Sequence, residues 1–358
     1  MSGGLRPRQP TIRDIANRAG VAPMTVSRAI NDKGYVSPGA RQRIMQAVKD
    51  LDYHPNGLAR SLKRSRTHVI GILLPDIAHP FSAELARHLE QTLLSHGYTS
   101  FISTSQRSIE REQTALNAFF DHRVDGIVVA TLETRAGNDA LLRFVNRGLP
   151  VVVVGRTLSH PNVDQVNADH FHGGREMVNH LVSLGHRRIG FIGASGAVNS
   201  VLPRLHGYMD GIRVHNCDLD PELIVGPDDL DSPAFATQEE GFDGMRRLLQ
   251  LPKCPTAVFA RNDAVAIGAM RAARDLGLSI PGDIAIAGFD NVPMSAYTSP
   301  PLTTVNQPTA ILGQRAAEFV LDRIEGRVSA DRRDLCLDCE IVVRQSTIGS
   351  GVPAKHAM

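Results

Sequence analysis

Five residues within one short segment carry side chains that could read and grip nucleic acid. Arg28 can donate two hydrogen bonds to the O6 and N7 atoms of guanine. Thr25 and Ser27 carry short hydroxyl groups that suit phosphate oxygens. Pro23 and Met24 have no side-chain donor, so we expect them to make apolar contact with thymine methyl groups. The segment is therefore a candidate surface for direct readout of a base sequence.

This segment lies in a basic part of an otherwise acidic chain. Residues 1–66 hold 13 Lys and Arg against 4 Asp and Glu, whereas the remaining residues hold 26 against 33. A basic head of this kind suits a polyanion, because neutralised phosphates release condensed counterions and binding becomes strongly dependent on salt. The charge distribution indicates that head and body meet different partners.

Three short helices are predicted to position the candidate side chains. The sequence Thr11-Ile12-Arg13-Asp14 has the form of a capping box and starts a helix that stops at Gly20. A second helix begins at Pro23, and a third follows Ser37-Pro38 and runs to about Leu51. Two helices joined by a glycine turn and braced by a third form a helix-turn-helix unit, whose second helix enters the major groove. The alternative is a three-helix bundle that docks on a protein.

Four dense motifs carry a resemblance to a known family. They are Thr-Ile-Arg-Asp-Ile-Ala (11–16), Gly-Val-Ala (20–22), Thr-Val-Ser-Arg-Ala-Ile-Asn (25–31) and Asn-Gly-Leu-Ala-Arg-Ser-Leu (56–62). With them the chain resembles the lactose-repressor/galactose-repressor (LacI/GalR) family of bacterial transcriptional regulators, and the likeness extends over residues 10–350. The resemblance implies a homodimer on a pseudo-palindromic operator in double-stranded DNA.

The resemblance also implies a hinge helix and linker at residues 56–66 that fold on the operator. Leu62 would be wedged with its dimer mate into the central minor-groove step, which unstacks the step and bends the DNA. Ala59 and Lys63 match further contacts to the minor groove and the backbone. The alternative for Leu62 is an ordinary linker hydrophobe.

Past Arg66, apolar runs alternate with amphipathic helices, which predicts parallel sheets covered by helices on both sides. The runs that we expect as strands are 69–74, 98–103, 125–130, 150–154, 188–193, 257–260 and 284–289. About 290 residues exceed one core, so two lobes are expected. The fold class is therefore an all-α helix-turn-helix domain plus an α/β body of two parallel-sheet lobes, which by resemblance is periplasmic-binding-protein-like. The expected boundaries are 1–55 for the DNA-binding domain, 67–350 for the effector-binding and dimerisation body, and 351–358 for a tail.

Polar side chains follow most of these strands, at the carboxyl edge where open α/β sheets bind ligands. One such group per strand makes a polar ring suited to a small hydroxylated effector. By resemblance, some of these positions match ligand contacts of the family in the second lobe (Arg204, Asn262, Asp290) and in the first (Phe81, Ser82, Thr131). The full set of candidate effector contacts is Phe81, Ser82, Thr131, Arg156, Ser200, Arg204, Asn262 and Asp290.

One position departs from the family pattern. Gly155 stands where relatives often carry an acidic ligand contact, and Arg156 beside it is the candidate to compensate. Two arginines at one site would favour a carboxylated or phosphorylated ligand. The resemblance implies a sugar or a sugar acid as the effector. The alternative places Arg156 in a surface or interlobe ion pair. Phe235 is the candidate aromatic stacking partner.

By resemblance, three crossovers join the lobes, near Val166–Ala168, Tyr297–Pro300 and Val328–Asp331. The first lobe would then hold 67–166 and 299–329, including a strand at 302–305, and the second 167–298 and 330–350. An effector between the lobes would shift the balance between operator-competent and operator-incompetent states. A repressor released by its effector, a corepressor-dependent or activating regulator, and a non-sugar effector all stay open.

Several features argue against catalysis, a metal and a cofactor. Cys336 and Cys339 form a CxxC on a predicted strand, where they would face opposite sides. Gly190–Gly196 has the spacing GxxGxxG rather than a dinucleotide fingerprint, and Asp169 is expected to cap a helix. Few cysteines and the lack of a signal peptide or long apolar segment predict a cytoplasmic protein without membrane contact. A sugar-binding transport component and a Rossmann-type enzyme are the alternatives from other classes.

Overall fold

The computed structural model describes residues 10–32, 34–53, 66–106, 108–130, 135–193, 201–226, 237–328 and 331–348. The chain divides into two compact units, Met1–Thr67 and His68–Met358. Several predicted features lie outside the described residues, namely the hinge segment up to residue 65, the tail, and the candidate residues Ala59, Leu62, Lys63, Thr131, Ser200 and Phe235.

The first unit contains three helices around a small core: α1 (Ile12–Ala19), α2 (Pro23–Ile30) and α3 (Pro38–Asp50). The predicted capping box is confirmed, because Thr11 Oγ1 accepts the Asp14 N–H while the Asp14 carboxylate accepts the Thr11 N–H at 2.7 Å. Gly20 ends α1 in the left-handed region with φ of 65°. The Ser37 side chain makes no capping hydrogen bond, so Pro38 alone marks the start of α3. Fully buried apolar side chains from each helix close the core (Ile15, Val26, Ile44).

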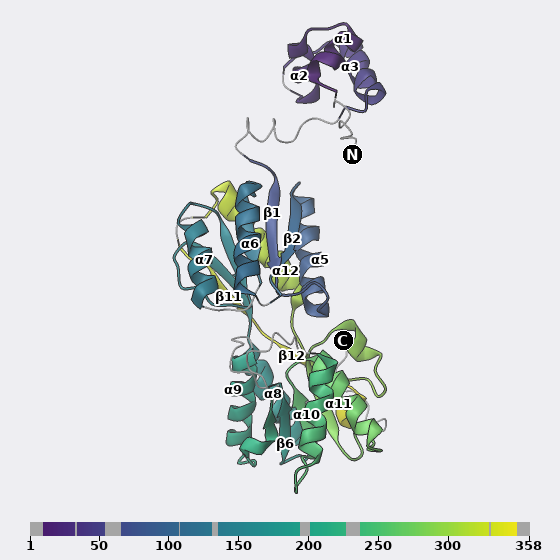
Figure 1. Ribbon diagram of the computed structural model, residues 1–358, viewed down its shortest axis with the longest axis vertical. Helices are drawn as coiled ribbons and strands as arrows, with labels where there is room; N and C mark the ends of the chain where they lie inside the picture. Colours follow the sequence, from purple (N-terminus) through teal and green to yellow (C-terminus); the bar gives the residue numbers. More distant parts are fainter. Residues whose placement is uncertain are drawn as a thin grey trace, which may run out of the picture. The chain divides into compact units, whose positions relative to one another are not determined.

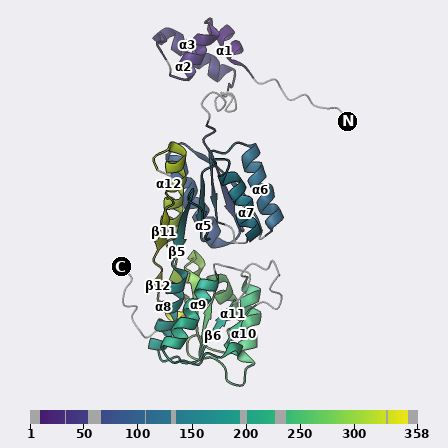
Figure 2. The same cartoon turned by 90° about the vertical axis from the view of Figure 1, so that its left-hand side faces the viewer.

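The first lobe of the second unit is built on an entirely parallel sheet with the strand order β11-β5-β4-β3-β1-β2. Helices α5 and α12 cover one face and helices α6 and α7 the other, as the two ribbon views agree (Figures 1 and 2). The elements are β1 (Val69–Leu74), α5 (Pro80–Ser95), β2 (Thr99–Thr104), α6 (Ile109–Asp121), β3 (Gly126–Val129), α7 (Arg135–Val145), β4 (Val151–Val154), β5 (Val163–Ala168), α12 (Thr309–Glu325) and β11 (Asp334–Leu337).

The second lobe repeats this plan with the strand order β12-β10-β9-β8-β6-β7, in which only β12 runs antiparallel to its neighbour among the described strands. Helices α8 and α9 pack together, as do α10 and α11. The elements are α8 (His170–Ser183), β6 (Ile189–Ile192), α9 (Val201–Val214), η1 (Pro221–Leu223), β7 (Ile224–Val225), α10 (Gln238–Leu249), β8 (Ala257–Ala260), α11 (Asp263–Asp275), β9 (Ala285–Asp290), η2 (Pro293–Ala296), β10 (Thr303–Asn306), β12 (Glu340–Val342) and α13 (Gln345–Ile348). The predicted fold class is confirmed.

Two of the three predicted crossovers are wrong. The first does lie just after β5, near residue 168. The strand at 302–305 was expected in the first lobe, but β10 pairs with β9 in the second-lobe sheet. The proline-rich stretch 299–301 is a turn within that lobe, because the Leu302 N–H bonds to the Ser295 carbonyl at 2.8 Å. The second crossover therefore follows Asn306, and the third joins β11 to β12 through residues 338–339.

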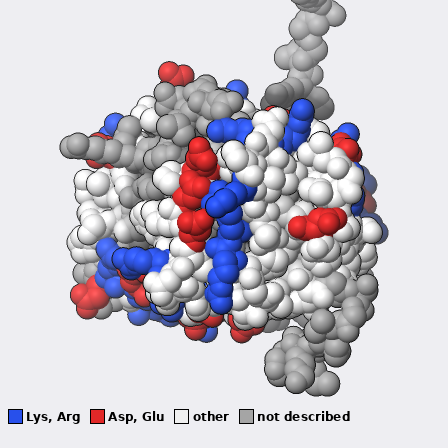
Figure 3. All heavy atoms as spheres, turned by 90° about the horizontal axis from the view of Figure 1, so that it is seen from below, with Lys and Arg blue, Asp and Glu red and all other residues white. Residues whose placement is uncertain are grey.

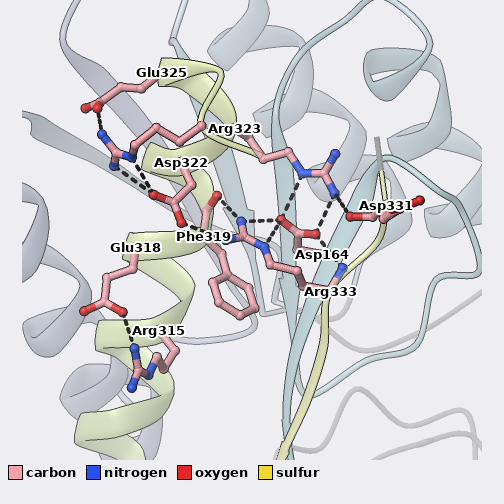
Figure 4. Close-up of polar contacts among 10 residues, drawn as sticks. Asp164, Arg315, Glu318, Phe319, Asp322, Arg323, Glu325, Asp331 and Arg333 are labelled. Carbon is pink, nitrogen blue, oxygen red and sulfur yellow. Dashed lines mark hydrogen bonds and ion pairs between the residues drawn. The ribbon is translucent and has the colours of Figure 1, made fainter. Parts of the chain in front are cut away.

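Asp164 holds the edge strand β11 against the first lobe (Figure 4). This fully buried carboxylate on β5 accepts hydrogen bonds from Arg323 at 2.6 Å and from the Arg333 side chain at 2.7 Å, and also the Arg333 N–H at 2.9 Å. Burial alone would raise the pKa of Asp164, but the hydrogen bonds from both arginines outweigh it and lower the pKa. Arg333 also stacks on Phe319, with 3.8 Å between the guanidinium carbon and the ring centroid. The strand that leads into the third crossover is thus fastened to the first lobe.

Candidate DNA-binding face and interlobe site

The predicted DNA-contacting side chains share the outer face of α2. Pro23, Met24 and Arg28 are exposed, and Met24 exposes 64% of its surface. Thr25 and Ser27 are half-buried at the edge of this face. An exposed methionine on a small domain contributes little to folding, so its position suits contact with another molecule.

The arginines of the head fall into two groups. Arg41 on α3 pairs with Asp32 at 2.7 Å and reaches the Ala29 carbonyl at 3.4 Å, and Arg43 donates to the Ala19 carbonyl at 3.2 Å. These two side chains brace the ends of α1 and α2. Arg28, in contrast, has no hydrogen-bond or ion-pair partner among the described residues, so its guanidinium can meet a base or a phosphate.

In the body, Arg204 is the centre of a buried polar cluster in the second lobe. Its Nε donates to His170 Nδ1 at 3.0 Å, one terminal nitrogen donates to the Arg261 carbonyl at 2.6 Å, and the other lies 3.3 Å from Asp290 Oδ1. The guanidinium carbon stands 3.9 Å from the ring centroid of Phe289. Burial, together with the Arg204 charge, holds the pKa of His170 well below its usual range, so this imidazole is a neutral acceptor.

Asp290 and Asp263 form an acidic pair at the end of β9. Asp290 has φ of 107°, and its Oδ1 accepts a hydrogen bond from Gln307 Nε2 at 2.6 Å. Asp263 is fully buried, with Thr304 Oγ1 2.5 Å from its Oδ1 and the Val292 N–H bonded to its Oδ2 at 2.8 Å. Burial and the nearby Asp290 charge raise the pKa of Asp263 to about 8. One carboxyl of the pair is therefore protonated at neutral pH.

Asn262 connects the second lobe to the first. Its Oδ1 caps α11 by accepting the Val265 N–H at 3.0 Å, which turns its Nδ2 toward His79 Nε2 at 3.2 Å. His79 lies in the loop between β1 and α5 of the first lobe. His79 was not predicted from the sequence, although it follows β1 at the carboxyl edge where open α/β sheets bind ligands.

Beside Asp290 lies a cavity of about 360 Å³ between the lobes. Phe81 and Glu84 line it from α5, and Asp290 and Asn291 line it from the end of β9. Gln307 and Thr309 complete it at the second crossover. Of the candidate effector contacts, Phe81 and Asp290 line this cavity, whereas Arg204 does not line it but pairs with Asp290.

Comparison with known proteins identifies the architecture. Residues 11–56 match the model of bacterial regulatory proteins of the lacI family, and residues 178–347 match a periplasmic binding protein-like domain. The transcriptional repressor CytR of Escherichia coli K12 is 33% identical over 337 residues, which cover 94% of this chain and 96% of that protein. The repressor PurR of Pasteurella multocida is 32% identical, with 94% and 98% covered. The chain belongs to the LacI family.

Solved structures agree with the membership in the LacI family. The lac repressor dimer bound to operator and the anti-inducer ONPF has a TM-score of 0.84 at 26% identity, with 96% of this chain and 100% of that chain covered. A complex of the regulator CelR with cellobiose has a TM-score of 0.69 at 30% identity, with 94% and 99% covered. This LacI-family chain is thus a DNA-binding transcriptional regulator of the repressor type with a ligand-binding body, and it is not an enzyme.

Arg156 lies apart from the arginine cluster of this LacI-family site. Its side chain is fully buried within the first lobe, 3.3 Å from Glu112 of α6 and hydrogen-bonded to Asn138 of α7. The alternative of an ion pair therefore describes Arg156 better than a ligand contact, although the pair is buried inside one lobe. Ser82 is also buried, on α5, and does not line the cavity.

The other described features of the body do not indicate a metal site or a redox site. Cys336 is exposed on β11, whereas Cys339 is buried in the third crossover. Over the described ranges, no group of three or more His, Cys, Asp or Glu could hold a metal ion, and no helix is long and apolar enough to cross a membrane. Asp169 caps α8, as predicted, by accepting the His172 N–H at 2.8 Å. Seen from below, the body carries basic side chains next to acidic ones rather than one sign of charge (Figure 3).

Proposed function

We propose that this LacI-family regulator binds a pseudo-palindromic operator as a homodimer and that a small hydroxylated effector between its lobes controls the binding. The exposed face of α2 is the observation that carries the first half of this proposal. Pro23, Met24 and Arg28 would meet bases, while Thr25 and Ser27 would meet phosphates. Ala59, Leu62 and Lys63 remain predicted hinge contacts in the minor groove. Because operator DNA is its partner, the cytoplasm is the proposed location.

The edge of the first-lobe sheet supports a homodimer. Strand β2 has no neighbour on its outer side within the described sheet. Phe101 and Ile102, which point to opposite faces of this strand, expose 41% and 44% of their surfaces, and Leu94 on α5 exposes 67%. An exposed apolar edge of this kind is unfavourable in an isolated chain, because it offers a template for pairing. A two-fold partner would cover it and set the spacing of two α2 helices on adjacent half-sites.

The connections between the lobes support effector control. Three crossovers and the His79–Asn262 contact join two otherwise separate sheets. Asp290 sits at the end of β9, close to the second crossover that Gln307 occupies. A ligand on Asp290 would therefore favour one lobe arrangement, and in a dimer the operator affinity would follow. The geometry is equally compatible with an inducer that lowers operator affinity and with a corepressor that raises it.

Operator selection from a random DNA library tests the DNA-binding half. The wild type should select a two-fold symmetric site, and Arg28→Ala should lose about 1–3 kcal/mol of operator binding and relax one base preference in each half-site. Arg213→Ala, on an arginine of α9 that is 77% exposed, should bind like the wild type. Equal base preferences in the Arg28→Ala and wild-type proteins would contradict the assignment of Arg28.

A ligand screen tests the effector half. Thermal unfolding of the wild type with sugars, nucleosides and their charged derivatives should give a selective hit, and operator binding measured with that hit gives the sign of the response. Arg204→Ala should keep its operator affinity and lose the response, because the variant leaves Asp290 without its buried partner. A dose response equal to that of the wild type would remove Arg204 from the effector site.

A further inference from the structure

Two ionisable side chains are among the described residues that line the interlobe cavity, and both are acidic. Glu84 projects from α5 and Asp290 from β9, and no Lys, Arg or His is among the described lining residues. The other polar groups are amides and a hydroxyl (Asn291, Asn306, Gln307, Thr309). A ligand in this cavity therefore meets negative charge and hydrogen-bonding groups.

Each acidic group is already paired with an arginine outside the lining. Glu84 bonds to Arg87 at 2.6 Å, and this hydrogen bond lowers the pKa of Glu84 even though burial acts in the opposite direction. Asp290 pairs with Arg204, whose other nitrogens are bonded to His170 and to the Arg261 carbonyl. Arg156, the other candidate for an anionic ligand, pairs with Glu112 within the first lobe. Among the described residues, the cavity thus requires no cation from the ligand and offers no arginine to an anion.

One acceptor at the cavity is the second oxygen of Asp290. The Asp290 side chain is 4% exposed, and its contacts with Arg204 and Gln307 both involve Oδ1. Oδ2 accepts no hydrogen bond from the described residues and is not closed off from solvent, so a donor in the cavity can reach it. Asp290 and Asn291 also have φ of 107° and 54°, a region that non-glycine residues seldom adopt. A ligand hydroxyl would supply the missing donor.

Donors come from the first turn of α12. Ala310 and Ile311 line the cavity at the start of this 17-residue helix. Among the described residues their N–H groups bond to no backbone carbonyl, since the first bond of the helix runs from the Leu312 N–H to the Pro308 carbonyl. A helix N-terminus alone would favour an anion, because it is equivalent to about half a positive charge. Two carboxylates, each paired with an arginine outside the cavity lining, oppose it here, so these donors suit the oxygen of a neutral hydroxyl.

We propose that this cavity selects an uncharged, hydroxyl-bearing effector and rejects its phosphorylated or carboxylated counterparts. The inference rests on the proposed effector function and narrows its ligand class. It replaces the expectation of a sugar acid, which depended on Arg156 standing beside Arg204.

Matched ligand pairs test the charge selection on the full-length protein. The probes are glucose with glucose phosphate and glucuronate, ribose with ribose phosphate, and adenosine with adenosine monophosphate, each titrated by calorimetry and thermal shift. We expect binding within one family of probes, with the anionic member weaker than its neutral parent by about tenfold or more, because like charges next to each other are costly. An anionic member that binds as tightly as its parent overturns the inference.

Glu84→Gln separates charge selection from a general effect on structure. The variant should gain about tenfold in affinity for the anionic member while its affinity for the neutral parent changes by less than about threefold, since one like charge is removed. Glu90→Gln, on the exposed side of the same helix, should change neither affinity. No gain for the anion in Glu84→Gln overturns the inference.

Operator binding measured beside these titrations distinguishes the two proposals. Neutral binding that leaves operator affinity unchanged contradicts the proposed function and upholds charge selection. Anion binding that is as tight as that of the neutral parent and that changes operator affinity contradicts charge selection and upholds the proposed function. If no probe binds, both proposals fail.

Discussion

Asp263→Asn is the perturbation whose size the structure determines best. The folded-state pKa of Asp263 is about 8, against an ordinary value of 3.8, because the carboxyl is buried and Asp290 is close. Between these two pH values the folded protein holds a proton that the unfolded chain has lost. The free energy of unfolding therefore falls as the pH rises, by about 1.4 kcal/mol per pH unit, and becomes flat above the folded-state pKa.

The variant should remove this slope. An asparagine can mimic the protonated acid, since its amide nitrogen can donate to Thr304 Oγ1 while its oxygen accepts the Val292 N–H. From about pH 5 to about pH 8 the variant should therefore gain about 4 kcal/mol relative to the wild type. Urea unfolding followed by circular dichroism at several pH values measures this difference.

Asp275→Asn is the matched control, because Asp275 ends the same helix α11 and its side chain is 53% exposed. Its unfolding profile should run parallel to that of the wild type at every pH. Parallel profiles for Asp263→Asn and the wild type would refute the reasoning, because Asp263 would then ionise equally in the folded and unfolded chains.

Two further predictions concern a glycine in close contact with Arg261 and the buried ion pairs of Asp164. Gly193→Ala should lower stability by about 2 kcal/mol or more, because φ is 108° and the new Cβ would lie 2.4 Å from Arg261 Cδ. Gly185→Ala, with φ of 95° and open space around the Cβ, should lose less, and equal thermal midpoints for the two variants would contradict the clash. Asp164→Asn should cost about 3–5 kcal/mol in urea unfolding, because Arg323 and Arg333 lose their buried partner. Asp334→Asn, whose side chain is 50% exposed, should stay within about 0.5 kcal/mol of the wild type, and the same small loss in Asp164→Asn would show that the network is dispensable.

Local patterns in the sequence predicted the elements well. The capping box at Thr11 and the cap at Asp169 depend only on residues three positions apart, and both are present. The run 257–260 is a strand with the predicted bounds, because a short apolar run leaves little choice of conformation. The exposed face of α2 follows from helical periodicity in the same way.

Pairings between distant residues could not be predicted in this way. The pattern of β10 indicates a strand, yet its sheet is decided by hydrogen bonds to β9 and β12. Arg156 meets Glu112, which lies 44 positions earlier, and no local signal connects the two. The Asn262–His79 contact spans 183 positions and depends on how the lobes meet. Because such long-range pairings were not predictable, the sequence indicated a site with two arginines, whereas the structure has a cavity lined by two acidic residues.

The positions of the crossovers have a consequence for how the protein is made. The three described helices of the head lie before residue 53. Both sheets, in contrast, need edge strands that come late in the chain, β11 at 334–337 and β12 at 340–342. A chain emerging from the ribosome therefore presents a finished DNA-reading domain while two sheets still have open edges, which are prone to mispairing. A product truncated before β11 would keep the α2 surface but lack an edge strand in both sheets, so effector sensing and the proposed dimer would be impaired together.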